Sequence, residues 1–196
     1  PSNFSDCWHM DIGYGPCCSI GGYKYTLLLV DKATRYKYIY GLRNLKHDIL
    51  LAIQEFLATV PVLPKLLRTD FDYKLMGGKV RQFLHLKGIQ VQAAPPFRQH
   101  QNGLVERAWQ TLVDMSRNWL RSSLLPSKFW FHAIRHACMI SNILPTSHTS
   151  EIITPFELAF QTKVDYRQLI PLFSIAYIQQ PQLTDGGHKI IGHTTH

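Results

Sequence analysis

The spacing of apolar residues in the first forty positions predicts three neighbouring strands. Residues 7–12 form a short strand-like segment that Gly13 and the following Gly-Pro pair should stop. Residues 25–30 are a continuous apolar run, which is typical of a central strand covered on both faces. Residues 36–40 alternate, as in a half-exposed strand. Together they predict an antiparallel meander.

Downstream, the apolar spacing changes to three and four residues, which predicts helices between shorter strands. The first helix carries six apolar positions and ends before Pro61: Leu45, Ile49, Ile53, Phe56, Leu57 and Val60. A strand at 65–69, a helix at 78–86 and a strand at 89–91 follow. With a helix after the last strand, this order predicts a ribonuclease-H-like α/β fold, a five-stranded mixed sheet flanked by helices.

The helix after residue 102 has the clearest two-sided pattern. Asn102 is a suitable N-cap. One face is apolar: Leu104, Ala108, Leu112, Met115 and Trp119. The opposite face is polar: Glu106, Gln110, Arg117 and Arg121. We therefore expect one side of this helix to be buried and the other to meet solvent or a ligand.

The C-terminal third predicts one long helix and then a smaller extension. A helix from about Ser127 to Pro145 should bury Trp130, Ile134, Ala137 and Ile140. A short capped helix at 154–158 and a strand at 175–178 follow. We divide the chain into a core at 1–146 and a partial post-core region at 147–196.

The charge balance favours a polyanionic partner. The chain has 21 basic and 13 acidic residues and a net charge of +8, so nucleic acid is the first candidate and a membrane surface the second. No apolar run approaches the roughly 20 residues that span a bilayer, and we expect no membrane partner.

The four cysteines lack metal-ligand spacing, and reduced intracellular thiols are expected. His132 and His136 are four apart, but the Glu of zinc proteases does not follow His132.

Three acidic residues form the candidate catalytic set. Asp11 lies in the first strand, Asp70 follows the fourth, and Glu106 is in the first turn of the polar-faced helix. Singly, each is more simply a turn, capping or helix-dipole residue. In this strand order they converge, and two charges about 4 Å apart repel by about 4 kcal/mol at an effective dielectric near 20. Divalent Mg²⁺ or Mn²⁺ would offset that repulsion, and paired ions suit phosphodiester chemistry.

A series of motifs, in order, resembles the integrases of copia-type retrotransposons, within the wider group of retroviral integrases. The resemblance covers nearly the whole chain. The upstream motifs are Trp8 to Ile12 with Gly15-Pro16, Val30-Asp31 with Thr34-Arg35-Tyr36, Arg68-Thr69-Asp70, Pro95-Pro96-Phe97 and His100 to Arg107. The downstream motifs are Pro126 with Phe129-Trp130, Asn142 to Thr146, Thr154 to Leu158, Gln168-Leu169 to Ile178, and Ile191-Gly192.

The resemblance implies a metal-dependent polynucleotidyl transferase with two ions of Mg²⁺ or Mn²⁺. Asp11 would bridge both ions, and Asp70 and Glu106 would each hold one. The enzyme would process the 3′ ends of the element's DNA and transfer them into target DNA, without a protein nucleophile. It also implies a homo-oligomer with DNA as its partner and no small-molecule substrate. The expected location is intracellular. The protein would first be in cytoplasmic particles and then in the nucleus, where integration takes place.

Six residues are candidates for DNA contact: Asn102, Gly103, Arg107, Gln110, Arg117 and Arg121. Residues 106, 110, 117 and 121 fall on one side of a helix, so the basic residues continue the edge on which Glu106 lies. This face could follow a phosphate backbone. The alternative is that Arg117 and Arg121 are only a solvated surface.

The chain departs from the family pattern in ways that leave alternatives open. The family usually places Asn-Gly-Gly-Glu after the second Asp, but this chain has Phe71 to Lys74, so Asp72 competes with Asp70. Gln99 replaces a usual Pro, and the zinc-binding module that usually precedes this core in the family is not among these 196 residues. The chain begins with Pro, and we expect a piece of a longer protein. A catalytically inactive DNA-binding or assembly remnant is the alternative. A host ribonuclease H or exonuclease would lack the block from Asn102 to Arg107.

Overall fold

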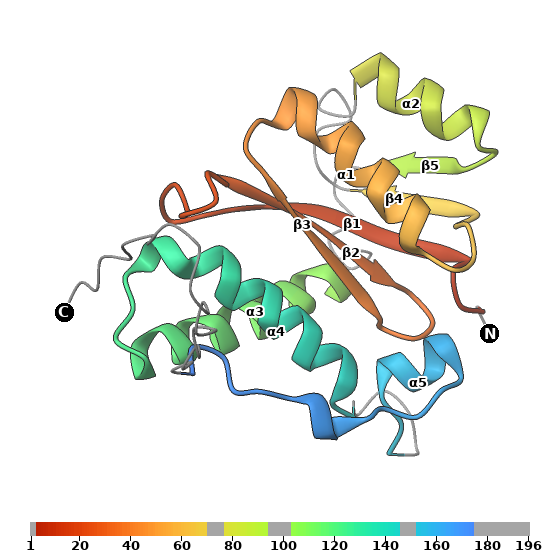
Figure 1. Ribbon diagram of the computed structural model, residues 1–196. Helices are drawn as coiled ribbons and strands as arrows, with labels where there is room; N and C mark the ends of the chain where they lie inside the picture. The colour runs from red at the N-terminus through yellow and green to blue at the C-terminus, as the bar shows by residue number, and fades with distance from the viewer. Residues whose placement is uncertain (1–2, 70–76, 94–102, 146–151, 175–196) are drawn as a thin grey trace, which may run out of the picture.

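The computed structural model describes residues 3–69, 77–93, 103–145 and 152–174, and it contains one mixed sheet between two layers of helices (Figure 1). The strands are β1 (Cys7–Tyr14), β2 (Tyr25–Asp31), β3 (Lys37–Leu42), β4 (Leu66–Thr69) and β5 (Gln90–Ala93). The helices are α1 (Leu45–Thr59), α2 (Gly77–Leu86), α3 (Gly103–Ser122), α4 (Trp130–Ile143) and α5 (Pro155–Phe160). Two 3-10 turns are η2 (Ser127–Phe129) and η3 (Tyr166–Gln168).

The strand order is β3-β2-β1-β4-β5, which confirms the ribonuclease-H-like α/β prediction. The pairs β1–β2 and β2–β3 are antiparallel, whereas β1–β4 and β4–β5 are parallel. In the β1–β4 register, Met10 is the partner of Thr69. The end of β4 therefore lies beside the middle of β1.

Two apolar cores cover the two faces of the sheet, and β2 contributes to both. Leu27 and Leu29 pack with α1 and α2, whereas Leu28 and Val30 pack with α3 and α4. Because successive side chains of a strand point to opposite faces, a strand between two helical layers must be apolar at every position. This explains the continuous apolar run in β2. In β1, Met10 belongs to the core beneath α1 and α2.

The observed elements differ from the predicted ones at several places. The strand expected to stop at Gly13 continues to Tyr14, because Gly13 still pairs with Thr26. The buried line of α3 is Val105, Ala108, Leu112 and Ser116, so the apolar stripe is turned slightly from the predicted one. On α4, Ile140 is only half-buried. Asn102 and the strand expected at 175–178 lie outside the described residues.

The short helix α5 begins with the expected cap and packs back onto the core. Thr154 Oγ1 accepts a hydrogen bond from the Glu157 amide at 3.1 Å, and the Thr154 amide donates to Glu157 Oε2 at 3.0 Å. Phe160 lies against Phe4 and Tyr36. The domain boundary predicted at residue 146 falls outside the described residues. None of the helices in the described part of the chain has the length and apolar character to cross a bilayer.

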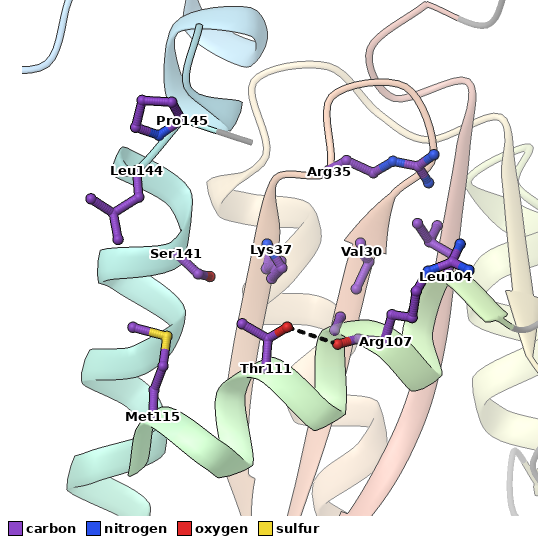
Figure 2. A pocket seen from close by; sticks show the side chains of 11 residues that line it. Val30, Arg35, Lys37, Leu104, Arg107, Thr111, Met115, Ser141, Leu144 and Pro145 are labelled. Carbon is purple, nitrogen blue, oxygen red and sulfur yellow. Dashed lines mark hydrogen bonds between the residues drawn. The ribbon is translucent and has the colours of Figure 1, made fainter. Parts of the chain in front are cut away.

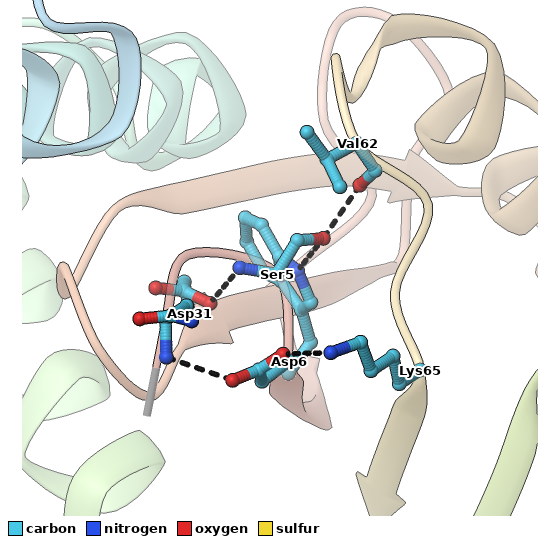
Figure 3. A network of polar contacts seen from close by, with 7 residues as sticks. Ser5, Asp6, Asp31, Val62 and Lys65 are labelled. Carbon is cyan, nitrogen blue, oxygen red and sulfur yellow. Dashed lines mark hydrogen bonds and ion pairs between the residues drawn. The ribbon is translucent and has the colours of Figure 1, made fainter. Parts of the chain in front are cut away.

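A buried carboxylate joins the N-terminal segment to the turn after β2 (Figure 3). Asp31 is fully buried, and its Oδ1 accepts from the Ser5 amide at 3.0 Å. Its Oδ2 accepts from the amide and hydroxyl of Thr34 at 2.7 and 2.8 Å, and from the Ala33 amide at 3.1 Å. Burial raises the pKa of Asp31, while these hydrogen bonds act in the opposite direction. The Asp31 carboxylate thus accepts four hydrogen bonds, and it binds the backbone amides of the N-terminal segment and of the turn after β2.

Candidate active site

Asp11 lies in the middle of β1, and a tryptophan from α3 fixes its carboxylate. Trp109 Nε1 donates to Asp11 Oδ2 at 2.9 Å, and the Ile12 amide donates to Asp11 Oδ1 at 2.8 Å. The side chain is half-buried. These two donors, one from α3 and one from β1 itself, fix the orientation of the carboxylate.

The contact between Trp109 and β1 depends on Gly13. A Cβ atom at Gly13 would lie 2.5 Å from Trp109 Cη2 and 2.9 Å from Thr26 Oγ1. The indole ring therefore lies directly on the strand, with its nitrogen at Asp11. Sequence reasoning missed Trp109. A glycine inside a strand often marks a close approach by another group, and that signal was available at Gly13.

Glu106 is exposed in the first turn of α3, three residues before Trp109. Residues three apart on a helix are neighbours on its surface, about 5–6 Å apart at Cβ. Glu106 thus lies next to the residue that binds Asp11. Its carboxylate makes no hydrogen bond or ion pair with any residue in the described ranges. Asp11 and Glu106 are therefore on the same side of the sheet, on contacting elements.

The third predicted acid, Asp70, lies outside the described residues, as does its competitor Asp72. The approach to Asp70 is described, because Thr69 is the last residue of β4 and pairs with Met10. The residues before Asp11 and Asp70 are therefore partners in a parallel ladder. The choice between Asp70 and Asp72 stays a prediction.

A mostly apolar cavity of about 550 Å³ opens beside Asp11. Trp109 and Trp130 form part of its wall, and Arg117 contributes a cation to the same cavity. Trp130 is held by a hydrogen bond from its Nε1 to the Cys17 carbonyl oxygen at 3.0 Å. The structure thus places Arg117 and Asp11 around one space, which periodicity along α3 alone could not show.

The residues predicted for DNA contact do not share one surface. Gln110, Arg117 and Arg121 are exposed on α3, and the last two line one shallow cavity. Gln110 Nε2 donates to Asp114 Oδ2 at 2.8 Å. Arg107 belongs to a different cavity, beside Arg35. Gly103 begins α3, and Asn102 lies outside the described residues.

The available donors fit a hard divalent cation. Asp11 and Glu106 offer carboxylate oxygens, the ligands that Mg²⁺ and Mn²⁺ prefer. Within the ranges that the structure describes, no three His, Cys, Asp or Glu side chains are grouped closely enough to hold a metal. The predicted set needs Asp70 as its third member, and that residue is not described.

Comparison with known proteins gives relatives in sequence and in fold, although no family model matches. The chain is 29% identical over 147 residues to the Pol polyprotein of transposon TNT 1-94 from Nicotiana tabacum, covering 70% of this chain and 11% of that protein. It is 28% identical over 171 residues to that of transposon RE2 from Arabidopsis thaliana, covering 85% and 11%. The Ty1-DR4 Gag-Pol polyprotein of Saccharomyces cerevisiae is 26% identical over 147 residues, covering 69% and 9%. The chain thus spans about a tenth of its curated relatives' length.

The solved structures similar to this chain include two retroviral integrase cores and a chain of a retroviral intasome complex. The catalytic core domain of HTLV-2 integrase, in complex with magnesium, aligns with a TM-score of 0.63 at 17% identity, over 80% of this chain and 97% of that one. The core domain of BIV integrase aligns with a TM-score of 0.59 at 18% identity, over 80% and 95%. A chain of the simian T-cell lymphotropic virus intasome aligns with 0.67 at 16% identity, over 91% and 61%. The chain is therefore homologous in sequence to a segment of retrotransposon Pol polyproteins, and it has the ribonuclease-H-like fold of retroviral integrase catalytic cores.

Proposed function

We propose that this chain is the integrase catalytic core of a retrotransposon polyprotein, a metal-dependent enzyme that processes DNA 3′ ends and joins them to target DNA. The observation that carries the proposal is the Asp11 carboxylate, which Trp109 orients at 2.9 Å beside the strand that leads into Asp70. Homology to Pol polyproteins supports the same assignment. A solved structural neighbour is an integrase core in complex with magnesium, which supports a divalent ion here.

Each acid of the proposed site has a defined part. Asp11, Asp70 and Glu106 would hold two ions of Mg²⁺ or Mn²⁺, which would supply stabilisation of the charge that develops on the phosphodiester. Trp109 keeps Asp11 in one orientation. Glu106 is exposed and makes no hydrogen bond or ion pair with described residues, so no described partner would compete with a metal for its carboxylate. The attacking groups would be water and then the 3′-hydroxyl of the DNA.

We propose DNA as the partner, both the element's ends and the target. Arg117 shares a cavity with Asp11, and Arg121 continues the same side of α3. This arrangement would place a phosphate backbone across the acids. We further propose a homo-oligomer that acts in the nucleus. One structural neighbour is described as a trimeric form and another as part of an intasome.

The test is DNA joining by matched acid variants. The purified chain would be incubated with Mn²⁺ or Mg²⁺ and a branched DNA that mimics a joined product, because reversal of joining releases a strand of defined length. Asp11→Asn and Glu106→Gln should each abolish the reaction. Asp114→Asn is the control, since Asp114 is exposed on the same helix and only accepts from Gln110. It should retain the activity.

The alternative, an inactive DNA-binding or assembly remnant, gives a different result. Such a protein would bind the branched DNA with no metal-dependent product from the unmodified chain. Activity that survives Asp11→Asn would contradict the proposed site directly. Asp70→Asn and Asp72→Asn, compared in the same assay, would decide which acid is the second ligand.

A further inference from the structure

A second cavity lies beside α3 (Figure 2). It is on the opposite side of this helix from the cavity that contains Asp11. Its volume is about 470 Å³, and the turn between β2 and β3, helix α3 and the C-terminal end of α4 surround it. Leu104, Arg107 and Thr111 face this cavity, whereas Trp109 and Val113 face the one beside Asp11. These two sets of positions lie about half a helical turn apart.

Three basic side chains line this cavity, and none of the eleven described lining residues is acidic. We call it the cationic pocket, defined by Arg35, Lys37 and Arg107. The remaining lining is apolar or carries a hydroxyl group. Like charges gathered in a partly enclosed space repel one another more strongly than at an open surface, because less water screens them. Such a set favours an anion.

Lys37 is the most unusual member of the pocket. It is only 8% exposed, and Asn142 holds its backbone through hydrogen bonds of 2.9 Å to the amide and 2.8 Å to the carbonyl oxygen. Its ammonium group makes no hydrogen bond or ion pair with the residues that the structure describes. Burial raises the pKa of the neighbouring Cys138 thiol to about 12, so that thiol is neutral and supplies no counter-charge. Lys37 lines the cavity, so an anion in the cavity could reach this ammonium while most of the side chain stays buried.

The two arginines are held near each other and near Lys37. Figure 2 shows Arg107 extending from α3 toward the turn that carries Arg35. Burial lowers the pKa of Arg35 first, and the positive charge of Arg107 lowers it further. The nearby acid Asp31 acts in the opposite direction.

We propose that the cationic pocket binds the phosphoryl group of a phosphate ester, with Arg35, Lys37 and Arg107 as its donors. Guanidinium groups match phosphate oxygens in geometry, and the ammonium adds a point charge. The cavity is larger than one phosphate ion requires, and Leu104, Met115 and Leu144 offer apolar contact to the body of an ester. The proposal is independent of the catalytic function, because an inactive remnant would keep the same pocket.

The primary experiment measures phosphate binding by calorimetry on the purified chain, with inorganic phosphate as probe and chloride at matched ionic strength as reference. Lys37→Met keeps an unbranched side chain, one atom shorter than lysine, and removes the charge. It should weaken phosphate binding at least about tenfold. The same variant should be more stable than the unmodified protein when phosphate is absent, because it removes the repulsion between Lys37 and the two arginines of the pocket.

Lys46→Met is the matched control, since Lys46 is exposed on α1, across the sheet. It should bind phosphate as the unmodified protein does. Equal losses in both lysine variants, or unchanged binding in Lys37→Met, would overturn the proposal. Acetate that binds as tightly as phosphate would also overturn the proposal, because the pocket would then not distinguish a phosphoryl group from a carboxylate. Arg107→Gln, at an exposed position, is a second variant should Lys37→Met fail to fold, and it should also weaken binding.

A further measurement with a short DNA duplex distinguishes two sources of the phosphoryl group. A backbone phosphate in the pocket predicts that Lys37→Met and Arg107→Gln each lower the salt slope of DNA binding by about one unit. A free phosphate ester predicts unchanged DNA binding with loss of inorganic phosphate binding. Either result supports the pocket as a phosphoryl site.

Discussion

The contact between β1 and α3 can be tested by adding a single methyl group. In Gly13→Ala, the new Cβ would lie 2.5 Å from Trp109 Cη2, 2.8 Å from Cζ2 and 2.9 Å from Thr26 Oγ1. Overpacking of this kind costs about 1–3 kcal/mol. Replacing Gly in a strand recovers roughly 0.5–1 kcal/mol. We therefore expect a net loss of about 1–2 kcal/mol in the free energy of unfolding.

The same clash should largely disappear in a Trp109→Phe background. Cη2 and Cζ2 belong to the six-membered ring of the indole. The smaller side chain of phenylalanine does not reach the positions of these two atoms. Trp109→Phe alone also loses the hydrogen bond to Asp11, at a cost of about 1–3 kcal/mol. The double variant should therefore be more stable than the sum of the two single losses predicts, by about 1 kcal/mol or more.

Urea unfolding of the four proteins in this cycle measures the coupling. In thermal unfolding, the same loss of 1 kcal/mol would lower the Tm of a domain of this size by about 2–4 °C. Gly78→Ala is the control, because a Cβ there meets nothing within 4 Å, and it should not destabilise the protein. Strict additivity of Gly13→Ala and Trp109→Phe would mean that the ring does not lie on β1 as described, and the orientation of Asp11 by Trp109 would lose its support.

Three further predictions concern stability. Asn142→Leu removes both hydrogen bonds to the Lys37 backbone and should cost about 2–4 kcal/mol, measured by guanidinium unfolding; a loss below 1 kcal/mol would contradict the buried pairing. Thr154→Ala removes the cap of α5 and should cost about 1 kcal/mol, seen as faster hydrogen exchange confined to that helix. Burial lowers the pKa of His136, so the folded protein favours the neutral imidazole. The resulting contribution to the free energy of unfolding is present above the ordinary histidine pKa near 6.5 and is lost as the pH falls below it. His136→Gln should flatten that pH dependence; an unchanged profile would assign it to other groups.

The layered fold could be predicted because each element carries its own local pattern. The continuous apolar run of β2 indicates burial on both faces, and β2 does lie between two helical layers. The spacing in α1 correctly placed Ile49, Ile53 and Phe56 in the core. The end of β1 was predicted wrongly at Gly13, because glycine was interpreted as a stop when the strand needs it for the approach of Trp109.

The details of the site could not be predicted, because they join residues far apart in the sequence. Asp11 was correctly placed on the first strand, but nothing in its local sequence indicates that Trp109 would bind it. Arg107 and Arg117 were both predicted to contact DNA, because one belongs to the family motif and both lie on the same helix. The structure separates them, since Arg107 faces the turn that follows β2 and Arg117 faces β1. Only the packing of α3 on the sheet decides which cation meets which cavity.

The hydrogen bond between Trp109 and Asp11 has a consequence for how the protein acquires its properties during folding. It joins residues 98 positions apart, and β1 pairs with β4 only after a long intervening segment has been brought back. Contacts this distant in the chain are delayed by the entropy of closing the loop, whereas a hairpin such as β2–β3 or a single helix forms from local contacts. Arg117 and Arg121, four residues apart on α3, become neighbours as soon as that helix forms. Under the function proposed above, a partly folded chain should therefore attract DNA before Asp11 is oriented, and reaction with DNA should be among the last properties that the folding protein gains.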